Sequence, residues 1–268
     1  MFTNEKCKDM RKIKLLYILF PLALGIGGIL HSCTKQTEGP VFSVASLNVV
    51  NVLPTSKPLI LVQGTISSAI GHFSSIGTLS YGSATVLTPS QGSEILYALQ
   101  NNIDTASVTG QGGNYMFDGE LSLSAGSLYS LYIAGADTTS PDYLFVQDTV
   151  FKRTDSTVGI RFVNLSTGSN PVSVDIKGQA NGSVLSSLAY KGITSFISFP
   201  ANSSISSYIF EFRDAISGNL LTTYTLSGVN TKSPTTSNIV IFRNLTIALI
   251  GQPSGGKIHQ SCIRVNSF

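Results

Sequence analysis

The chain has 268 residues and a formal net charge of +3, and charged residues make up only 12% of it. Its first 33 residues hold five basic and two acidic side chains, so the remainder carries twelve of each sign and no net charge. Nucleic-acid binding needs several Lys or Arg contacts to phosphates, and a neutral protein supplies few of these. We therefore expect no nucleic-acid partner.

The N-terminal segment has the layout of a secretory signal peptide. An apolar stretch begins at Leu15 and ends in Leu30-His31-Ser32-Cys33, and it follows a basic run made of Lys6, Lys8, Arg11, Lys12 and Lys14. A basic region, a short apolar core and a small-residue site predict a signal peptide, and the core is short for a membrane-spanning helix. An uncleaved N-terminal anchor is the alternative, and the chain starts at Met1 or Met10.

The end of this segment resembles the lipobox of bacterial lipoproteins, in the loose form found in Bacteroidetes. Leu30 stands three positions before Cys33 and the small residue Ser32 just before it, although His31 departs from the usual small residue. The resemblance implies that the chain is cut before Cys33 and that its thiol is lipidated. Several acyl chains give stable attachment to a bilayer. It implies a lipid-anchored outer-membrane protein, with the periplasmic or surface-facing leaflet left open.

Beyond residue 43, short β-branched or aromatic runs alternate with Gly, Ser, Asn and Pro, which predicts strands and turns. No run keeps a helical period over three turns, so we expect no helix there. The fold class is therefore all-β, with two tandem immunoglobulin-like β-sandwich units after an N-terminal lipoprotein signal helix. The expected divisions are the signal peptide 1–33, a tether 34–43, the first sandwich 44–152, the second sandwich 153–250, and a tail 251–268 that could add a strand.

The two units are related by an internal repeat. Residues 47–58 align with residues 160–171 at an offset of 113, which places the pair Val50-Asn51 on Val163-Asn164. An offset of 109 then aligns Tyr81 with Tyr190, and residues 131–135 with residues 240–244. These anchors predict two copies of one unit of about 110 residues, each with roughly seven strands.

At these anchors the chain resembles the DUF4397 family, a domain of unknown function found in bacterial cell-envelope proteins. The resemblance covers most of residues 44–250 and rests on the two repeat segments, on Tyr81-Gly82-Ser83 and on residues 123–126. In the turn after each Val-Asn pair, the closing prolines Pro58 and Pro171 match the family wording. The resemblance implies β-sandwich units on the envelope, and it assigns no catalytic or binding residue.

Few residues suggest chemistry. Residues 251–257 resemble most of a phosphate-binding loop, but Ile258 stands where a Ser or Thr would hold magnesium, so we expect a Gly-rich turn and no nucleotide. His72 and His259 are isolated histidines, and neither a nucleophile elbow nor a cysteine pair accompanies them. We expect no catalytic residue, metal site or cofactor, and we expect Cys262 to be a packing residue rather than a reactive thiol.

Four triplets of Asp, a hydroxyl residue and a small or aliphatic residue resemble the O-glycosylation signal of Bacteroidetes envelope proteins. The hydroxyl groups that the resemblance marks are those of Thr105, Thr138, Thr149 and Ser156. The alternative is that these residues form turns, because Asp and Thr are common turn residues in any β-protein.

The sequence favours a non-enzymatic cell-envelope lipoprotein with a structural, adhesive or scaffolding role. The alternative is a glycan-binding accessory lipoprotein of a nutrient-uptake system, which would use aromatic side chains as platforms for sugars. The available tyrosines are Tyr97, Tyr115, Tyr129, Tyr132 and Tyr143. The expected partners are the membrane, through the lipid anchor, and an envelope protein or a glycan.

Overall fold

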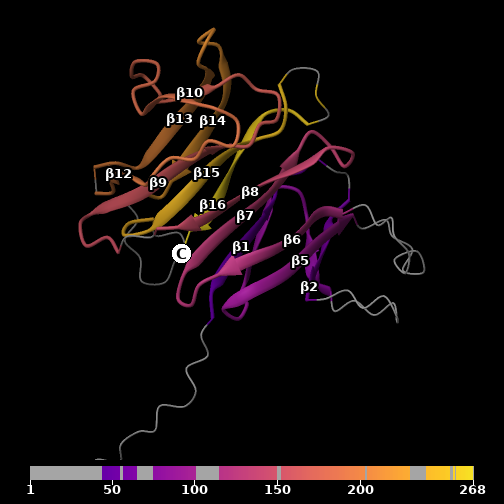
Figure 1. Cartoon of the computed structure of the whole chain (residues 1–268). Coiled ribbons are helices and arrows are strands. Elements are labelled where there is room, and N and C mark those ends of the chain that lie inside the picture. The colour runs from indigo at the N-terminus through magenta and orange to yellow at the C-terminus, as the bar shows by residue number, and fades with distance from the viewer. Residues whose placement is uncertain are drawn as a thin grey trace, which may run out of the picture. The chain divides into compact units, whose positions relative to one another are not determined.

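The computed structural model describes residues 44–54, 57–64, 75–100, 115–149, 152–202, 204–229, 240–253, 256 and 258–267. The predicted signal helix, the tether and Cys33 lie outside these residues. Ser43–Phe268 forms one compact unit, and its regular structure is β (Figure 1). Within the described ranges, no helix has the length and apolar character needed to span a bilayer.

Sixteen strands are described, eight in each half of the unit. The first half contains β1 (Ser46–Asn51), β2 (Leu59–Gln63), β3 (Ser75–Leu79), β4 (Ser83–Leu87), β5 (Gly92–Gln100), β6 (Tyr115–Leu123), β7 (Leu128–Gly135) and β8 (Pro141–Asp148). The second half contains β9 (Thr157–Asn164), β10 (Val172–Ile176), β11 (Leu185–Leu188), β12 (Ile197–Pro200), β13 (Ser207–Asp214), β14 (Leu220–Ser227), β15 (Asn244–Ile250) and β16 (Ser261–Ser267).

The two halves have the same topology. The first repeat has sheets of order β4-β1-β7-β8 and β3-β2-β5-β6, and the second has sheets of order β12-β9-β15-β16 and β11-β10-β13-β14. Adding eight to each strand number of the first repeat reproduces the second. The central pairs β1–β7 and β9–β15 are parallel, and the other pairs are antiparallel. The predicted all-β fold with two β-sandwich units is confirmed, with eight strands in each unit rather than about seven.

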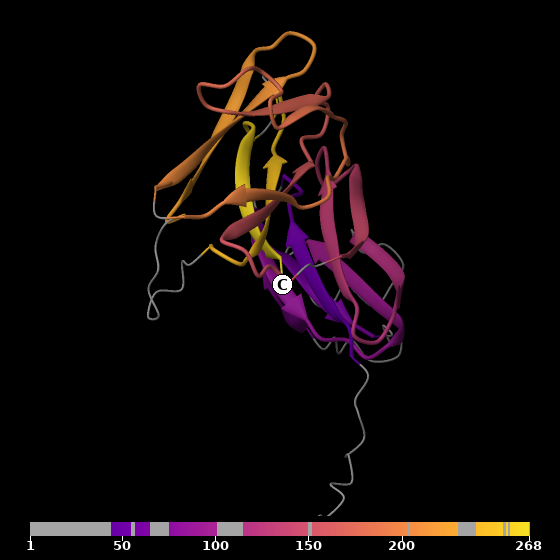
Figure 2. The same ribbon diagram turned by 90° about the vertical axis from the view of Figure 1, so that its left-hand side faces the viewer.

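Three apolar clusters hold these sheets together. One fills the first sandwich, another fills the second, and a third lies between the sheet β4-β1-β7-β8 and the sheet β12-β9-β15-β16. We call these two the inner sheets and the other two the outer sheets. Figure 2 shows the yellow strands β15 and β16 of the second inner sheet beside the indigo β1 of the first.

The central strands of the inner sheets are buried on both faces. In β1, Leu47 and Val49 point into the first sandwich, while Val50 packs in the cluster between the inner sheets. Burial on both faces accounts for the near-continuous apolar sequences of β1, β7, β9 and β15, because neither face meets water. The edge strands β4 and β14 instead alternate between more and less exposed residues.

The repeated Val-Asn pair has a structural role. The Asn51 side chain donates to the backbone oxygen of Leu79 at 2.9 Å and accepts from the amide of Leu53 at 3.1 Å. In the second repeat, Asn164 does the same with Leu188 and Ser166, at 3.1 Å each. Both asparagines are fully buried. Each therefore ties the end of its central strand to a neighbouring turn, which confirms the offsets of 113 and 109.

The third predicted anchor is wrong. Tyr132 pairs with Val50 in the first repeat, and Ala248 pairs with Val163 in the second, so β7 and β15 are related by an offset of 116. Residues 131–135 therefore correspond to residues 247–251 and not to residues 240–244. The connection from β14 to β15 is longer than that from β6 to β7, and its last residues include the apolar run that the offset of 109 aligns with β7.

The C-terminal residues complete the second repeat. β16 pairs with β15 from Ser261 to Ser267 and forms the edge of the second inner sheet, as β8 does in the first. The loop before it, from residue 251, is tied by the amide of Gln252 to the oxygen of Ile258 at 2.8 Å. A strand rather than a helix follows this loop, which is not the arrangement of a phosphate-binding loop.

We predict that Asn51→Ala and Asn164→Ala each lower the free energy of unfolding by about 1–3 kcal/mol, because each leaves a buried backbone carbonyl and amide without its partner. Urea unfolding followed by circular dichroism measures the loss. The exposed Asn219→Ala is the control and should change the unfolding free energy by less than about 0.5 kcal/mol. Equal, small effects of all three substitutions would contradict this role.

Candidate functional site

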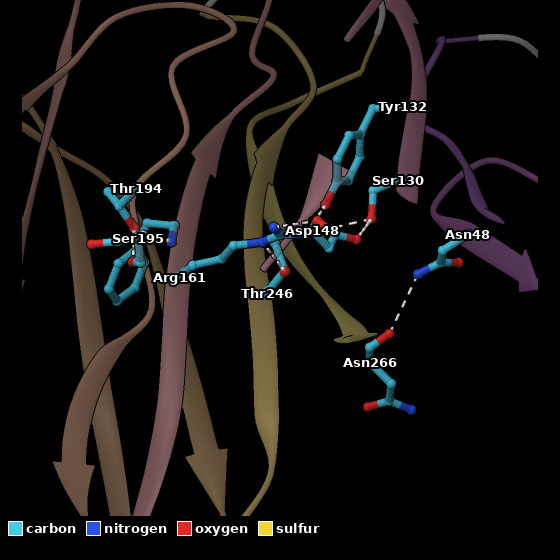
Figure 3. Close-up of polar contacts among 10 residues, drawn as sticks. Asn48, Ser130, Tyr132, Asp148, Arg161, Thr194, Ser195, Thr246 and Asn266 are labelled. Carbon is cyan, nitrogen blue, oxygen red and sulfur yellow. Dashed lines mark hydrogen bonds and ion pairs between the residues drawn. The ribbon is translucent and has the colours of Figure 1, made fainter. Parts of the chain in front are cut away.

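A buried polar centre lies between the two inner sheets. It consists of Arg161 on β9, Thr246 on β15, Ser130 and Tyr132 on β7, and Asp148 at the end of β8 (Figure 3). Ile160 and Phe162 pack into the second sandwich, so alternation directs Arg161 between them toward the first repeat. The strand pattern thus places a cation at the middle of an otherwise apolar contact.

The guanidinium of Arg161 makes four contacts across this centre. Its Nε donates to Thr246 Oγ1 at 2.7 Å, and Nη1 donates to Asp148 Oδ1 at 2.5 Å. Its Nη2 lies 3.4 Å from Ser130 Oγ and 3.3 Å from the Tyr132 hydroxyl. Ser130 in turn donates to Asp148 Oδ2 at 2.7 Å. Both carboxylate oxygens therefore have a partner, and the centre joins four strands, two from each repeat.

The ion pair is shielded from water. The side chains of Arg161 and Asp148 are 6% and 0% exposed. The guanidinium carbon also lies 4.9 Å from the centre of the Phe196 ring, a distance suited to a cation–π contact. Burial raises the pKa of Tyr132, and the charge of Arg161 partly offsets this effect. An arginine side chain offers hydrogen-bond donors and no acceptor, so the arrangement suits a structural cross-link.

Further polar contacts surround this centre. Lys191 Nζ lies 2.9 Å from Asp142 Oδ1, and each of these side chains is 37% exposed. Gln252 donates to the backbone oxygen of Ala136 at 2.9 Å, and Asn48 donates to that of Asn266 at 3.3 Å. All three contacts join the first repeat to the second.

The Lys191–Asp142 pair depends on pH. Burial acts to raise the pKa of Asp142, but hydrogen bonds from Lys191 and from the amide of Tyr143, with the charge of Lys191, lower it overall from 3.8. The hydrogen bond to Asp142 raises the pKa of Lys191 from 10.5. The pair therefore stabilises the folded state at pH values between the pKa of Asp142 and the pKa of Lys191. This stabilisation is lost as the pH falls through the lowered pKa of Asp142. Because both side chains are exposed, the contribution is small.

The two repeats differ at this interface. The offset of 113 places Asn48 at the position of Arg161, and the Oδ1 atom of Asn48 is buried without a hydrogen-bond partner in the described part of the chain. The hydroxyl of Tyr81 is in the same situation, whereas its counterpart Tyr190 lies 3.2 Å from Thr167 Oγ1. Burial raises the pKa of Tyr81 to about 12. Of the two equivalent positions, 48 and 161, the interface therefore carries an ion pair at Arg161 and none at Asn48.

The residues predicted for modification do not form one site. Thr105 and Cys33 lie outside the described residues. Thr138 is half-buried in the turn between β7 and β8, while Thr149 and Ser156 are exposed. Asp148, which begins the triplet of Thr149, is the partner of Arg161. That triplet therefore includes a structural residue, which its spacing alone does not reveal.

The remaining predicted residues are also dispersed. Cys262 on β16 packs against the core of the second sandwich, and burial raises the pKa of its thiol well above the usual range. His259 is exposed in the loop before β16, and His72 lies outside the described residues. Within the described ranges, no group of three or more His, Cys, Asp or Glu residues is placed to hold a metal ion.

The predicted tyrosines separate into interior and surface groups. Tyr129 and Tyr132 are buried, and Tyr129 stacks on Phe145 with ring centres 5.4 Å apart. Tyr143 meets Phe117 edge to face. Tyr97 lies between Leu96 and Ala98, which point into the first sandwich, so its ring is on the opposite face of the outer sheet. The Tyr115 ring is 5.6 Å from it, and both residues are half-buried.

Comparisons with known proteins give no family. No protein-family model matches the chain, and no curated protein matches it. Among solved structures, two from streptococcal virulence factors match the chain. One is described as family 41 carbohydrate-binding modules that recognise α-glucan, at 12% identity, and the other as binding α-glucan, at 11% identity. Each match has a TM-score of 0.25 and covers 81% of this chain and 97% of the other. A candidate adhesin from Bacteroides ovatus matches at 10% identity with a TM-score of 0.25, covering 84% of this chain and 94% of its own. A TM-score of 0.25 is too low to indicate a shared fold.

We predict that Arg161→Met lowers the free energy of unfolding by about 3–5 kcal/mol, because it leaves the Asp148 carboxylate buried without a cation. The double variant Arg161→Met/Asp148→Asn should lose clearly less than the sum of the single changes, since no unpaired charge remains. Lys191→Met breaks the exposed pair and should cost no more than about 1 kcal/mol. Chemical denaturation at pH 7 of wild type, the two single variants, the double variant and Lys191→Met measures these values, and additive losses would contradict the coupling.

We also predict that Cys262 reacts slowly with iodoacetamide in the folded protein, because burial disfavours the thiolate that would attack. The reaction should become fast in urea above the unfolding midpoint. Mass spectrometry of the alkylated peptide gives the rate. Rapid alkylation in native buffer, at a rate equal to that in urea, would show an accessible thiol instead.

Proposed function

We propose that this protein is a non-enzymatic cell-envelope lipoprotein whose two sandwiches form a scaffold on the outer membrane. The observation that carries the proposal is the buried contact between the inner sheets, with the Arg161–Asp148 pair at its centre. Two sandwiches joined by a loop alone would move independently. Two sandwiches that share an apolar cluster and a buried ion pair hold their outer sheets in a fixed relation, as a scaffold requires.

The envelope location is supported by the leader. The basic run, the apolar stretch and the lipobox-like ending at Cys33 favour export and lipidation, and the resemblance to DUF4397 domains points to the same compartment. The mature chain has few charges and many Ser and Thr residues. The exposed hydroxyls of Thr149 and Ser156 would be open to O-glycosylation, together with Thr138 and Thr105 if the sequence signal is used.

Glycan binding is the second candidate function. The favouring observation is the Tyr97–Tyr115 pair on the outer face of β5 and β6, where two half-buried rings lie side by side. Aromatic rings stack on the apolar faces of sugars. A glycan array with wild type and Tyr97→Ala would separate the two functions, because a scaffold gives the same blank array for both proteins.

We predict that Cys33→Ala removes metabolic labelling by a palmitate analogue and moves the protein from the membrane fraction to the soluble fraction. The soluble product should keep its unfolding midpoint, because Cys33 lies outside the compact unit Ser43–Phe268. Cys262→Ala is the matched control and should stay labelled and membrane-bound. Labelling that persists in Cys33→Ala would contradict the anchor, and protease treatment of intact cells would assign the leaflet.

A further inference from the structure

The neutral mature chain is divided into two oppositely charged halves. Residues 44–149 carry seven acidic side chains and one lysine, whereas residues 150–268 carry four acidic and ten basic side chains. The formal net charges are therefore −6 and +6. This division follows the repeat boundary, and it is invisible in the total. Opposite charge on two repeats of the same fold is not required by that fold, because the two topologies are identical.

The contact between the repeats uses only part of this charge. Among the residues that the structure describes, two ion pairs cross it, Arg161–Asp148 and Lys191–Asp142. They take two acidic groups from the first repeat and two basic groups from the second, which leaves the halves at −4 and +4. Each repeat thus retains an excess of one sign for contacts beyond its own chain.

One of the remaining basic groups adjoins an unusual turn. Phe242 has a left-handed backbone, with φ of 64°, and its side chain is 49% exposed. At the equivalent position, by the offset of 116, the first repeat has Gly126 with φ of 68°. The Phe242 amide donates to the oxygen of Thr157 at 2.8 Å, and the Gly126 amide donates to that of Val44 at 2.9 Å. The turn forms equally well with glycine.

The phenylalanine is therefore present despite the backbone it must adopt. A large side chain rarely occupies the left-handed region, and glycine does so without steric cost. About half of its surface stays exposed in the isolated chain, so burial offsets only part of this cost. Residues held in such conformations cluster at binding and switching sites, so the Phe242 ring is a candidate contact for a partner molecule.

Basic residues adjoin the two segments that form this turn. Arg243 follows Phe242 in the chain and is exposed, and Lys152 is exposed on the connection between the repeats. Arg153 donates to Asn244 Oδ1 at 2.9 Å and to Thr157 Oγ1 at 3.3 Å, which ties it to the two segments that hold the turn. We call Lys152, Arg153, Phe242 and Arg243 the basic corner. Arginine and exposed aromatic residues are typical of the energetic centres of protein interfaces.

The first repeat presents a complementary surface. Asp118 lies opposite Tyr97 in the register of β5 and β6, Glu120 lies opposite Ile95, and both acidic residues are exposed. The Tyr97–Tyr115 ring pair lies beside them. We call Tyr97, Tyr115, Asp118 and Glu120 the acidic edge, because β6 is the edge strand of its sheet.

We propose that the basic corner of one molecule binds the acidic edge of a second copy of this chain. Arg243 and Arg153 would face Asp118 and Glu120, and the Phe242 ring would pack on the tyrosine pair. The contact joins two different patches, so its symmetry is heterologous and it leaves one patch of each kind free to continue an array. This self-association specifies the scaffold role proposed above and rests on it. It involves only the folded unit, so it needs no membrane.

The test uses purified Ser43–Phe268, which the structure shows as one compact unit with its own cores. Sedimentation velocity is measured over a range of concentrations in about 20 mM and about 500 mM salt, because screening shortens the reach of exposed charges. We expect concentration-dependent association at low salt and monomers at high salt. Monomers under every condition would overturn the proposal.

Three variants locate the contact. Phe242→Gly should raise the unfolding midpoint while weakening association about fivefold or more, a combination that a merely structural role would not give. Arg243→Glu and Asp118→Arg should each weaken association, and a mixture of the two single variants should associate again through the swapped pair. Ile216→Ser removes an exposed side chain elsewhere, 75% exposed, and should change nothing.

Two results would overturn the assignment. Association that is equal in wild type, Phe242→Gly and Arg243→Glu would place the contact elsewhere. A protein that stays monomeric but is retained on a heparin column through Phe242 and Arg243 would show that the basic corner serves a polyanion rather than a second copy. Because the unit lacks Cys33, neither result bears on lipidation, so failure of this inference is distinct from failure of the envelope anchor.

Discussion

The structure depends on burying both faces of four central strands. β1, β7, β9 and β15 each use one face to close their own sandwich and the other face to meet the inner sheet of the other repeat. The hydrophobic effect drives both contacts, and the parallel pairing in the middle of each inner sheet is suited to burial on two sides. The sandwiches, the interface and the orientation of the polar centre all follow from this constraint.

The ion pair within that interface sets its register more than its strength. Burying a cation and an anion costs solvation energy that their attraction roughly offsets. The cost of misplacing them is much larger, because a shifted interface would leave each charge unpaired among apolar residues. Arg161, Asp148 and their hydroxyl partners therefore select one alignment of two broad apolar faces that could otherwise slide.

The fold could be predicted from sequence to the extent that it rests on local patterns. Alternation and turn residues indicated strands, and the Val-Asn pairs located the duplication because both asparagines bond in the same way. The third anchor failed because short apolar runs resemble one another. Val240-Ile241-Phe242 resembles the start of the matched segment of β7, whose true counterpart in β15 lies seven residues later.

The polar centre could not be predicted at all. Arg161 and Asp148 are 13 residues apart in the chain, and only the face-to-face contact of the two inner sheets brings them together. The charge division was readable, but only once the boundary between the repeats was applied to the count.

The first repeat has Asn48 where the second has Arg161, and this difference matters while the chain is being synthesised. The first repeat leaves the ribosome with its inner face uncovered, and such a face could join that of a neighbouring nascent chain. Two first repeats placed together would enclose Asp148 with no guanidinium to meet it, since Asn48 stands where the arginine would be. The covering partner that satisfies this carboxylate is the second repeat, which arrives on the same polypeptide. The difference at this position thus disfavours pairing between two first repeats and favours pairing with the second repeat of the same chain.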